Sequence, residues 1–280
     1  MTRWLFLRGL SREARHWLPF PEHFERDVPG ARVHVLDLPG AGTEWRRTAP
    51  LSVAACVKDV RRRWLRIREA CGVDPAAPEH APHAAARAPW AILGISLGAM
   101  VALRWIADSP LDFERAVVIN TSAGDLSRPW ERMRLGVLPG LTRALRAGDP
   151  VAREREILGA TTRMFTGQDA LATRWAAYHR AQPMTHRNVL RQLAAGAAFR
   201  SPARVDVPLL VLAATHDPLA RAECGRRIAA RYGAPFEQHP AAGHDLPLDD
   251  PEWVTGRVAR WIARPPSRAG DRPLVQAKPD

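Results

Sequence analysis

The sequence predicts an α/β fold, in which a mostly parallel sheet is flanked by helices and carries an inserted helical cap. Apolar runs that suit buried strands alternate with segments of helical spacing in residues 1–122 and 208–263. Between these two parts lies a long stretch with helical patterns and no strand pattern, too long for a simple crossover between neighbouring strands. With 280 residues, of which 46% are hydrophobic, the chain can bury a substantial core.

The predicted strands are short apolar runs that end at turns or polar residues. The second of them ends at the Pro/Gly turn Asp37–Gly42, and Leu51–Ala70 then has the apolar spacing of a helix. Another helix is expected at Ala222–Tyr232, before the last strand. The expected strands cover residues 4–7, 32–36, 90–93, 116–120, 209–213 and 236–239.

The remaining segments complete the predicted organisation. Residues 123–207 are expected to form the cap over the carboxyl edge of the sheet, where ligands bind in open α/β folds. Residues 73–89 are rich in Ala, Pro and His and are expected to form a surface loop, in which His80 and His83 are solvated and bind no metal. The tail, residues 264–280, lacks periodicity and is expected to be disordered.

The chain carries a formal net charge of +12, which raises the question of a nucleic-acid partner. Of its 41 basic residues only Lys58 and Lys278 are lysines, and the arginines are spread along the whole chain. A bound nucleic acid would need them on one face, so no nucleic-acid partner is expected. An acidic partner, such as a carrier protein or a phosphate-bearing acyl donor, stays open.

The sequence lacks three further features that would indicate a particular class of protein: a membrane-spanning run, a signal peptide and cysteines at metal-ligand spacing. No apolar run approaches the roughly 20 residues that span a bilayer, and the N-terminal run is too short for a signal peptide. A cytoplasmic location without a membrane span is therefore expected. Cys56, Cys71 and Cys224 lie far apart without metal-ligand spacing, so they are expected to be reduced thiols rather than metal ligands.

The most informative motif is Gly94-Ile95-Ser96-Leu97-Gly98. It follows a predicted buried strand and precedes a predicted apolar helix, which is the context of a nucleophile elbow. Glycines at both ends allow the tight turn, and the helix N-terminus that follows favours negative charge. Ser96 is therefore the candidate nucleophile, against the alternative of an ordinary glycine-rich turn.

A serine needs a base that removes its proton and a carboxylate that orients this base. His244 follows the last predicted strand and Asp217 follows the strand before it, so the chain order Ser96, Asp217, His244 is that of a nucleophile-elbow triad. Asp125, after the 116–120 strand, is an alternative acid. The structural alternative is that Asp217 caps the next helix while His244 lies on a surface loop.

Two backbone N–H groups should receive the oxyanion that forms during acyl transfer. The first is the N–H of Leu97, directly after the nucleophile, and the second belongs to the loop after the first strand. In that loop Gly9 permits the turn, and Leu10 is the candidate donor. Losing one such donor typically costs about 3 kcal/mol in the transition state.

With these residues in place, the chain resembles the α/β-hydrolase superfamily over about residues 3 to 263, and within it the small capped esterases and thioesterases such as the pimeloyl-carrier-protein methyl ester esterases. The matching features are the 94–98 motif, the 37–42 turn, Asp217 and Gly243-His244. The resemblance implies a serine hydrolase of carboxylic esters or thioesters that needs no metal or organic cofactor. Arg8 departs from the family, which usually has His at this position.

The substrate is expected to be a small molecule with a hydrophobic acyl or alcohol group. A lactonase, a C–C hydrolase, an acyltransferase and a non-catalytic binding protein of this fold remain alternatives, and the oligomeric state stays open. About half of the apolar cap residues are expected only to pack the cap on the sheet. The candidate substrate-binding residues are Arg8, Trp130, Met133, Met164, Phe165, Trp175 and Tyr178.

Overall fold

A computed structural model describes residues 1–72 and 89–264. Its centre is a six-stranded sheet in the order β2-β1-β3-β4-β5-β6, and every neighbouring pair of strands is parallel. The α/β prediction is confirmed, with strand bounds within about two residues of those expected. The strands are β1 (Thr2–Leu7), β2 (Ala31–Leu36), β3 (Trp90–Ile95), β4 (Arg115–Ile119), β5 (Leu209–Ala214) and β6 (Phe236–His239).

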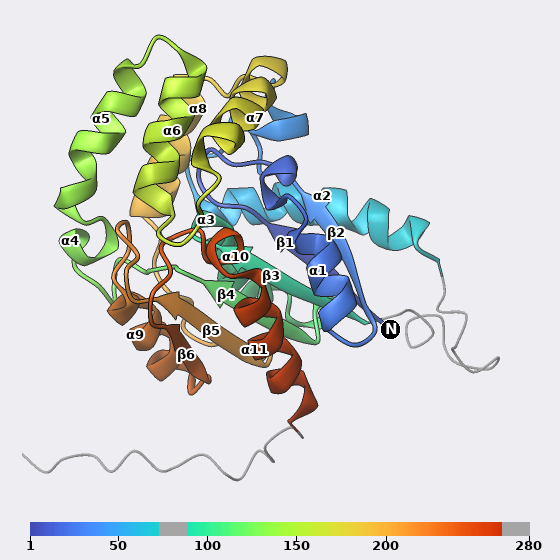
Figure 1. Cartoon of the computed structure of the whole chain (residues 1–280). Helices are drawn as coiled ribbons and strands as arrows, with labels where there is room; N and C mark the ends of the chain where they lie inside the picture. The colour runs from blue at the N-terminus through green and yellow to red at the C-terminus, as the bar shows by residue number, and fades with distance from the viewer. Residues whose placement is uncertain (73–88, 265–280) are drawn as a thin grey trace, which may run out of the picture.

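Helices cover both faces of this sheet, because successive strand side chains point to opposite sides (Figure 1). In β1, Leu5 and Leu7 join the core beneath α2 (Val53–Ala70), α3 (Leu97–Asp108) and α9 (Ala222–Tyr232). Trp4 and Phe6 join the opposite core beneath α1 (Phe20–Asp27) and α11 (Pro251–Ala263). All four side chains are completely buried, and each contributes about 1.5–3 kcal/mol of transfer free energy.

The long insertion between β4 and β5 is helical, as expected, and its helices gather at one end of the molecule (Figure 1). It has a small apolar core of its own around Leu158, Leu171 and Trp175. Treating residues 123–207 as a separate cap domain stays a prediction. The helices are α4 (Pro129–Arg132), α5 (Leu138–Arg146), α6 (Pro150–Thr161), α7 (Gln168–Ala181) and α8 (His186–Ala197), and the four-residue α10 (Leu246–Asp249) follows β6.

Two helices of the core were not predicted from the sequence, although each carries a start signal. In α1, Pro21 stands in the first turn, and Phe20 and Phe24 share one buried face. In α11, the carboxylate of Asp250 caps the Trp253 N–H and a proline occupies the first turn. Both are shorter than the 18-residue α2, α1 with 8 residues and α11 with 13, so fewer turns repeat the apolar spacing that marks a helix.

Three other expectations concern membrane spans, the cysteines and the two segments without periodicity. No helix in residues 1–72 and 89–264 is long and apolar enough to cross a bilayer. Cys56, Cys71 and Cys224 are free thiols, and burial raises the pKa of Cys56 to about 12, so this thiol is unreactive. The expected loop at residues 73–88, with His80 and His83, and the tail at residues 265–280 lie outside the described part of the chain.

Candidate active site

Ser96 stands on a sharp turn between β3 and α3, as the elbow motif predicts. Its backbone adopts φ = 55° and ψ = −119°, a conformation that side-chain-bearing residues rarely adopt and that marks functional sites. A Cβ on Gly94 would clash with the backbone of Gly98, and a Cβ on Gly98 would clash with the carbonyl oxygen of Leu7. The two glycines are therefore required by close backbone contacts on either side of the serine.

The candidate base and acid meet above the carboxyl ends of the strands. The Nδ1 of His244 and the Oδ2 of Asp217 are 2.8 Å apart, and both residues are buried. The other carboxylate oxygen of Asp217 accepts hydrogen bonds from the backbone N–H groups of Leu219, at 2.7 Å, and Ala220, at 3.0 Å. Asp217 therefore both begins the turn after β5 and holds the His244 ring.

The electrostatic surroundings of His244 favour its protonated form. Burial opposes the charge, but the Asp217 carboxylate, through its charge and hydrogen bond, outweighs burial. Asp245 adds to this effect and Arg8 opposes it, so the pKa of His244 is raised above its ordinary value. A histidine in this state readily stabilises the positive charge that it acquires when it removes a proton.

We expect kcat/KM to fall on acidification at a higher pH than an ordinary histidine would give. Only neutral His244 can accept a proton, and its raised pKa keeps it protonated to a pH above about 6.5. A pH profile of ester hydrolysis should therefore show an acid limb with its midpoint above this value. A midpoint near pH 5, with the protein still folded, would contradict this assignment of the base.

Among the described residues Ser96 Oγ makes no hydrogen bond to His244, so the candidate nucleophile and the candidate base are not hydrogen-bonded to each other here. Such contacts are often long in unliganded enzymes and tighten when substrate binds. Asp125, the alternative acid, accepts from the backbone N–H of Ser201 at 2.7 Å and from its hydroxyl at 2.5 Å. The hydrogen bond to His244 is formed by Asp217 instead.

The loop after β1 lies against the nucleophile, as the oxyanion-hole prediction requires. A Cβ on Gly9 would lie 2.9 Å from the Cβ of Ser96. Neither the Leu10 nor the Leu97 N–H donates a hydrogen bond to another group of the described chain. The next residue, Ser11, has φ = 57° and donates its N–H to the side chain of Gln192 in α8 at 3.2 Å. The helical insertion therefore holds the loop that carries Leu10.

Arg8 was expected to contact substrate, but the structure places its side chain in a buried ion pair. The guanidinium forms two hydrogen bonds with the carboxylate of Asp245, at 2.9 and 2.6 Å, and both side chains are only 5% exposed. It also lies 4.8 Å from the ring centre of Trp17. Arg8 thus joins the loop after β1 to the residue after His244 through a buried ion pair.

Breaking this ion pair should destabilise the protein strongly. We expect Arg8→Met to lower the free energy of unfolding by about 3–5 kcal/mol, because the Asp245 carboxylate is left buried without its partner. The double variant Arg8→Met/Asp245→Leu should regain much of this loss, since it leaves no buried charge. Denaturant unfolding of the wild type, Arg8→Met, Asp245→Leu and the double variant checks the result, and additive losses would contradict it.

Asn120 is a positioning residue that the sequence analysis did not identify. Its amide nitrogen donates to the carbonyl oxygens of Gly243, at 3.2 Å, and His244, at 2.8 Å, and its amide oxygen accepts from the Ala214 N–H at 2.8 Å. Asn120 therefore joins the ends of β4 and β5 to the loop of the candidate base. An amide that directly follows a buried apolar strand, with φ = 47°, was the available signal.

The candidate substrate-binding residues of the cap do not form one surface. Trp175 is completely buried in the cap core with the Arg12 guanidinium 4.4 Å from its ring centre, so it supports the cap instead of contacting substrate. Phe165 and Tyr178 pack against the same core. Met133 is half-buried and Met164 is exposed. Of these six candidate cap residues, Trp130 alone lines the large cleft of the cap, and this residue is 51% exposed.

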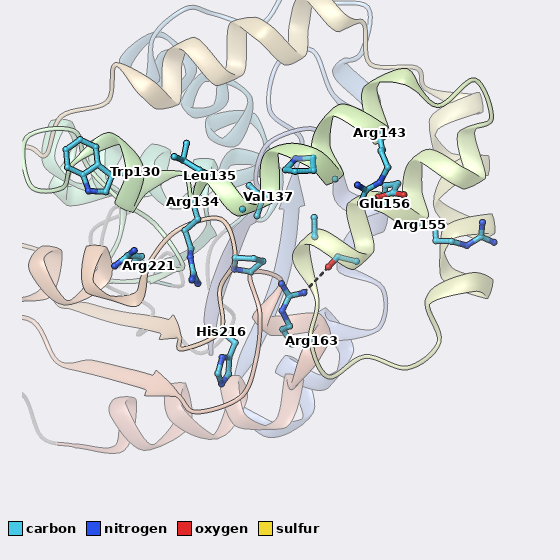
Figure 2. Close-up of a pocket in the computed structure, with 16 residues that line it drawn as sticks. Trp130, Arg134, Leu135, Val137, Arg143, Arg155, Glu156, Arg163, His216 and Arg221 are labelled. Carbon is cyan, nitrogen blue, oxygen red and sulfur yellow. Dashed lines mark hydrogen bonds and ion pairs between the residues drawn. The ribbon is translucent and has the colours of Figure 1, made fainter.

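That cleft has a volume of about 1080 Å³ and lies between the first half of the cap and the turn that carries Asp217 (Figure 2). Its lining combines apolar residues, which form the larger part, with five arginines that the sequence did not point to. In the described part of the chain, no three His, Cys, Asp or Glu side chains are arranged to hold a metal ion.

The parallel sheet, the strained serine and the buried His–Asp contact together define the α/β-hydrolase class. The sequence matches the Alpha/beta hydrolase family over residues 4–257, so the chain belongs to this family. Comparison with curated protein sequences returns no significant match.

Solved structures with the same fold come from several hydrolases. The chain is similar to 2-hydroxy-6-oxo-6-phenylhexa-2,4-dienoate hydrolase from Rhodococcus, with 16% identity and a TM-score of 0.71 over 94% of this chain and 91% of that one. A hydrolase from Pseudomonas aeruginosa has 22% identity and a TM-score of 0.66 over 94% and 90%. A lipase-esterase related protein from Clostridium acetobutylicum has 14% identity and a TM-score of 0.63 over 93% and 94%.

Proposed function

We propose that this hydrolase cleaves carboxylic esters or thioesters through an acyl-enzyme on Ser96, with His244 as the base and Asp217 as its orienting acid. The observation that carries the proposal is the buried 2.8 Å contact between His244 and Asp217, at the same edge of the parallel sheet as a serine held on a strained elbow. A structural histidine needs no nucleophile nearby, whereas this arrangement matches the requirements of acyl transfer.

In the first half of the reaction, His244 removes the proton of Ser96 while the serine oxygen bonds to the acyl carbon. The carbonyl oxygen becomes an oxyanion, which the N–H groups of Leu97 and Leu10 receive. The carbonyl reforms, the bond from the acyl carbon to the leaving oxygen or sulfur breaks, and His244 passes its proton to the leaving group.

In the second half, a water molecule replaces the leaving group. His244 removes a proton from this water, whose oxygen bonds to the acyl carbon. The bond to Ser96 then breaks, and the serine oxygen regains its proton from His244. The products are a free acid and an alcohol or thiol. Asp217 accepts the Nδ1–H of His244 and keeps this proton in place, so that Nε2 is free to accept.

Labelling with a fluorophosphonate tests whether Ser96 is activated. The wild type should become covalently modified on the peptide that contains Ser96, because only an activated serine attacks such reagents. The His244→Ala variant should lose the labelling while remaining folded by circular dichroism. A folded wild type that stays unlabelled at Ser96 would favour a non-catalytic binding protein of this fold.

A panel of p-nitrophenyl esters, acyl thioesters and lactones then defines the bond that is cleaved. We expect the highest kcat/KM among the open-chain esters and thioesters. Lactones as the best substrates would contradict this preference and assign the same triad to a lactonase.

A further inference from the structure

The large cleft of the cap carries a concentration of positive charge that the proposed reaction does not use. Its walls come from α4, α5 and α6 with the segment that joins α4 to α5, from the turn after α6 and from the turn after β5. Figure 2 shows Arg134 and Arg163 on facing sides of this cleft, with His216 below them and Trp130 at one end. Among the described residues that line the cleft, Glu156 is the one carboxylate. The arginines of the lining are Arg134, Arg143, Arg155, Arg163 and Arg221.

Three of these arginines have no carboxylate partner in the described part of the chain. Arg134 donates to the carbonyl oxygen of Asp217 at 3.2 Å, and Arg163 donates to the carbonyl oxygens of Gly159 and Thr162. The Arg221 side chain makes no ion pair or hydrogen bond there. The other two are neutralised, Arg143 by Glu156 at 3.0 Å and Arg155 by Asp169 at 2.7 Å.

Carbonyl contacts leave the charge of Arg134 and Arg163 uncompensated, and each guanidinium keeps N–H groups free for a ligand. The planar donor fork of arginine matches the oxygens of a phosphate, which it can bind through two parallel hydrogen bonds. Three such groups around one open cleft suit a ligand with several negative charges better than one with a single carboxylate.

The cleft also borders both loops of the candidate triad. His216 and Pro218, which line it, flank Asp217 in the sequence. On the other side, the Asp245 N–H donates to the carbonyl oxygen of Thr161 at 2.8 Å, at the end of α6. A Cβ on Gly243 would lie 3.1 Å from the side chain of Arg163. A ligand held by these arginines therefore lies next to the segments that carry Asp217 and His244.

We propose that this arginine cleft binds the phosphates of the leaving group, so that the substrate is an acyl thioester or ester whose leaving group is a phosphorylated, nucleotide-like molecule. This inference rests on the proposed function, since it assigns the leaving group of the same reaction. The volume of about 1080 Å³ accommodates such a group, as it exceeds the range of about 300–1,000 Å³ typical of pockets for drug-sized ligands. Arg134, Arg163 and Arg221 bind the phosphates, and the apolar surface of Trp130 packs against the rest.

The test compares two thioesters that share an acyl group and differ in phosphates: the coenzyme A thioester and the N-acetylcysteamine thioester. In Arg163→Glu and in Arg221→Glu, KM for the coenzyme A thioester should rise about tenfold or more. The kcat/KM for the N-acetylcysteamine thioester should change less than about twofold, which also shows that the triad is intact. Arg204→Glu is the matched control, because its side chain is 82% exposed and lies outside the cleft.

Binding without turnover keeps this inference separate from the proposed function. Calorimetry with Ser96→Ala should show binding of coenzyme A, weaker binding of dephospho-coenzyme A, no binding of pantetheine, and loss of coenzyme A binding when Arg163→Glu is added. If neither thioester is hydrolysed but this binding pattern appears, the reaction is wrong and the phosphate site stands. Equal kinetics for the two thioesters, or binding unchanged by Arg163→Glu, would overturn the phosphate site and leave the hydrolase intact.

Discussion

Replacing Ser96 with alanine is expected to lower kcat/KM for an activated ester by about 10⁶-fold. Without the hydroxyl no acyl-enzyme forms, and the oxyanion donors of Leu10 and Leu97 alone supply only a small part of the catalysis. Steady-state kinetics with a p-nitrophenyl ester, followed down to the uncatalysed rate, measures the loss.

The fold should survive this change, which makes the kinetic result interpretable. Alanine keeps the Cβ that already occupies the strained φ of 55°, and Ser96 Oγ has no hydrogen bond to His244 to lose within the described residues. The unfolding midpoint should therefore stay within about 2 °C of the wild type. Ser201→Ala, the same chemical change at a serine that pairs with Asp125, is the control and should keep full activity. Activity above about 1% in Ser96→Ala would show that the nucleophile is elsewhere.

The sheet and the contact between Asp217 and His244 could be predicted because both follow from local patterns. Each apolar run specifies a buried strand, and parallel strands end at the same edge, so polar residues after β5 and β6 must meet there. That is why Asp217 and His244, 27 positions apart, could be paired from the sequence. Glycines that permit a close backbone approach are equally local, and Gly94 and Gly98 lie where the elbow motif requires them.

The contacts that could not be predicted join distant loops. Arg8 and Asp245 are 237 positions apart, and their pairing depends on how two irregular turns pack, which no periodicity encodes. Which apolar cap residues pack the cap and which face a substrate could not be predicted, for a related reason. Helical spacing identifies an apolar face but not its partner, so Trp175 could be assigned equally to a substrate cavity or to the cap core, where it lies.

The clustering of positive charge in the arginine cleft could not be predicted from the sequence either. Arg134, Arg163 and Arg221 belong to three separate segments, each with an unremarkable number of basic residues, and only the fold gathers them. An even spread of arginine along the chain therefore argues against a continuous nucleic-acid-binding stripe. It leaves open a compact anionic site, because side chains from separate turns can meet at one cleft.

Replacing Asp217 with asparagine should lower kcat by about 10⁴-fold while leaving the site assembled. The N–H groups of Leu219 and Ala220 both point at Oδ1, so the amide oxygen of the new side chain takes that position and its NH₂ group faces His244. An NH₂ group can only donate to Nδ1. His244 is then fixed with its proton on Nε2, the tautomer that cannot accept a proton from Ser96. The measurement is kcat for an ester, with substrate at saturation.

The matched control is Asp125→Asn, the same change at the alternative acid. Asp125 binds Ser201 and not His244, so kcat should change less than about threefold, whereas the reverse order of the two effects would make Asp125 the acid. Adding Asp217→Asn to Ser96→Ala should cost almost nothing further, because members of a triad act as a unit. The pH profile separates orientation from simple structural damage. Loss of the Asp217 charge should move the pKa of His244 downward, since burial is then opposed by less negative charge. An unchanged pKa in Asp217→Asn would show that the Asp217 carboxylate is not what raises the pKa of His244.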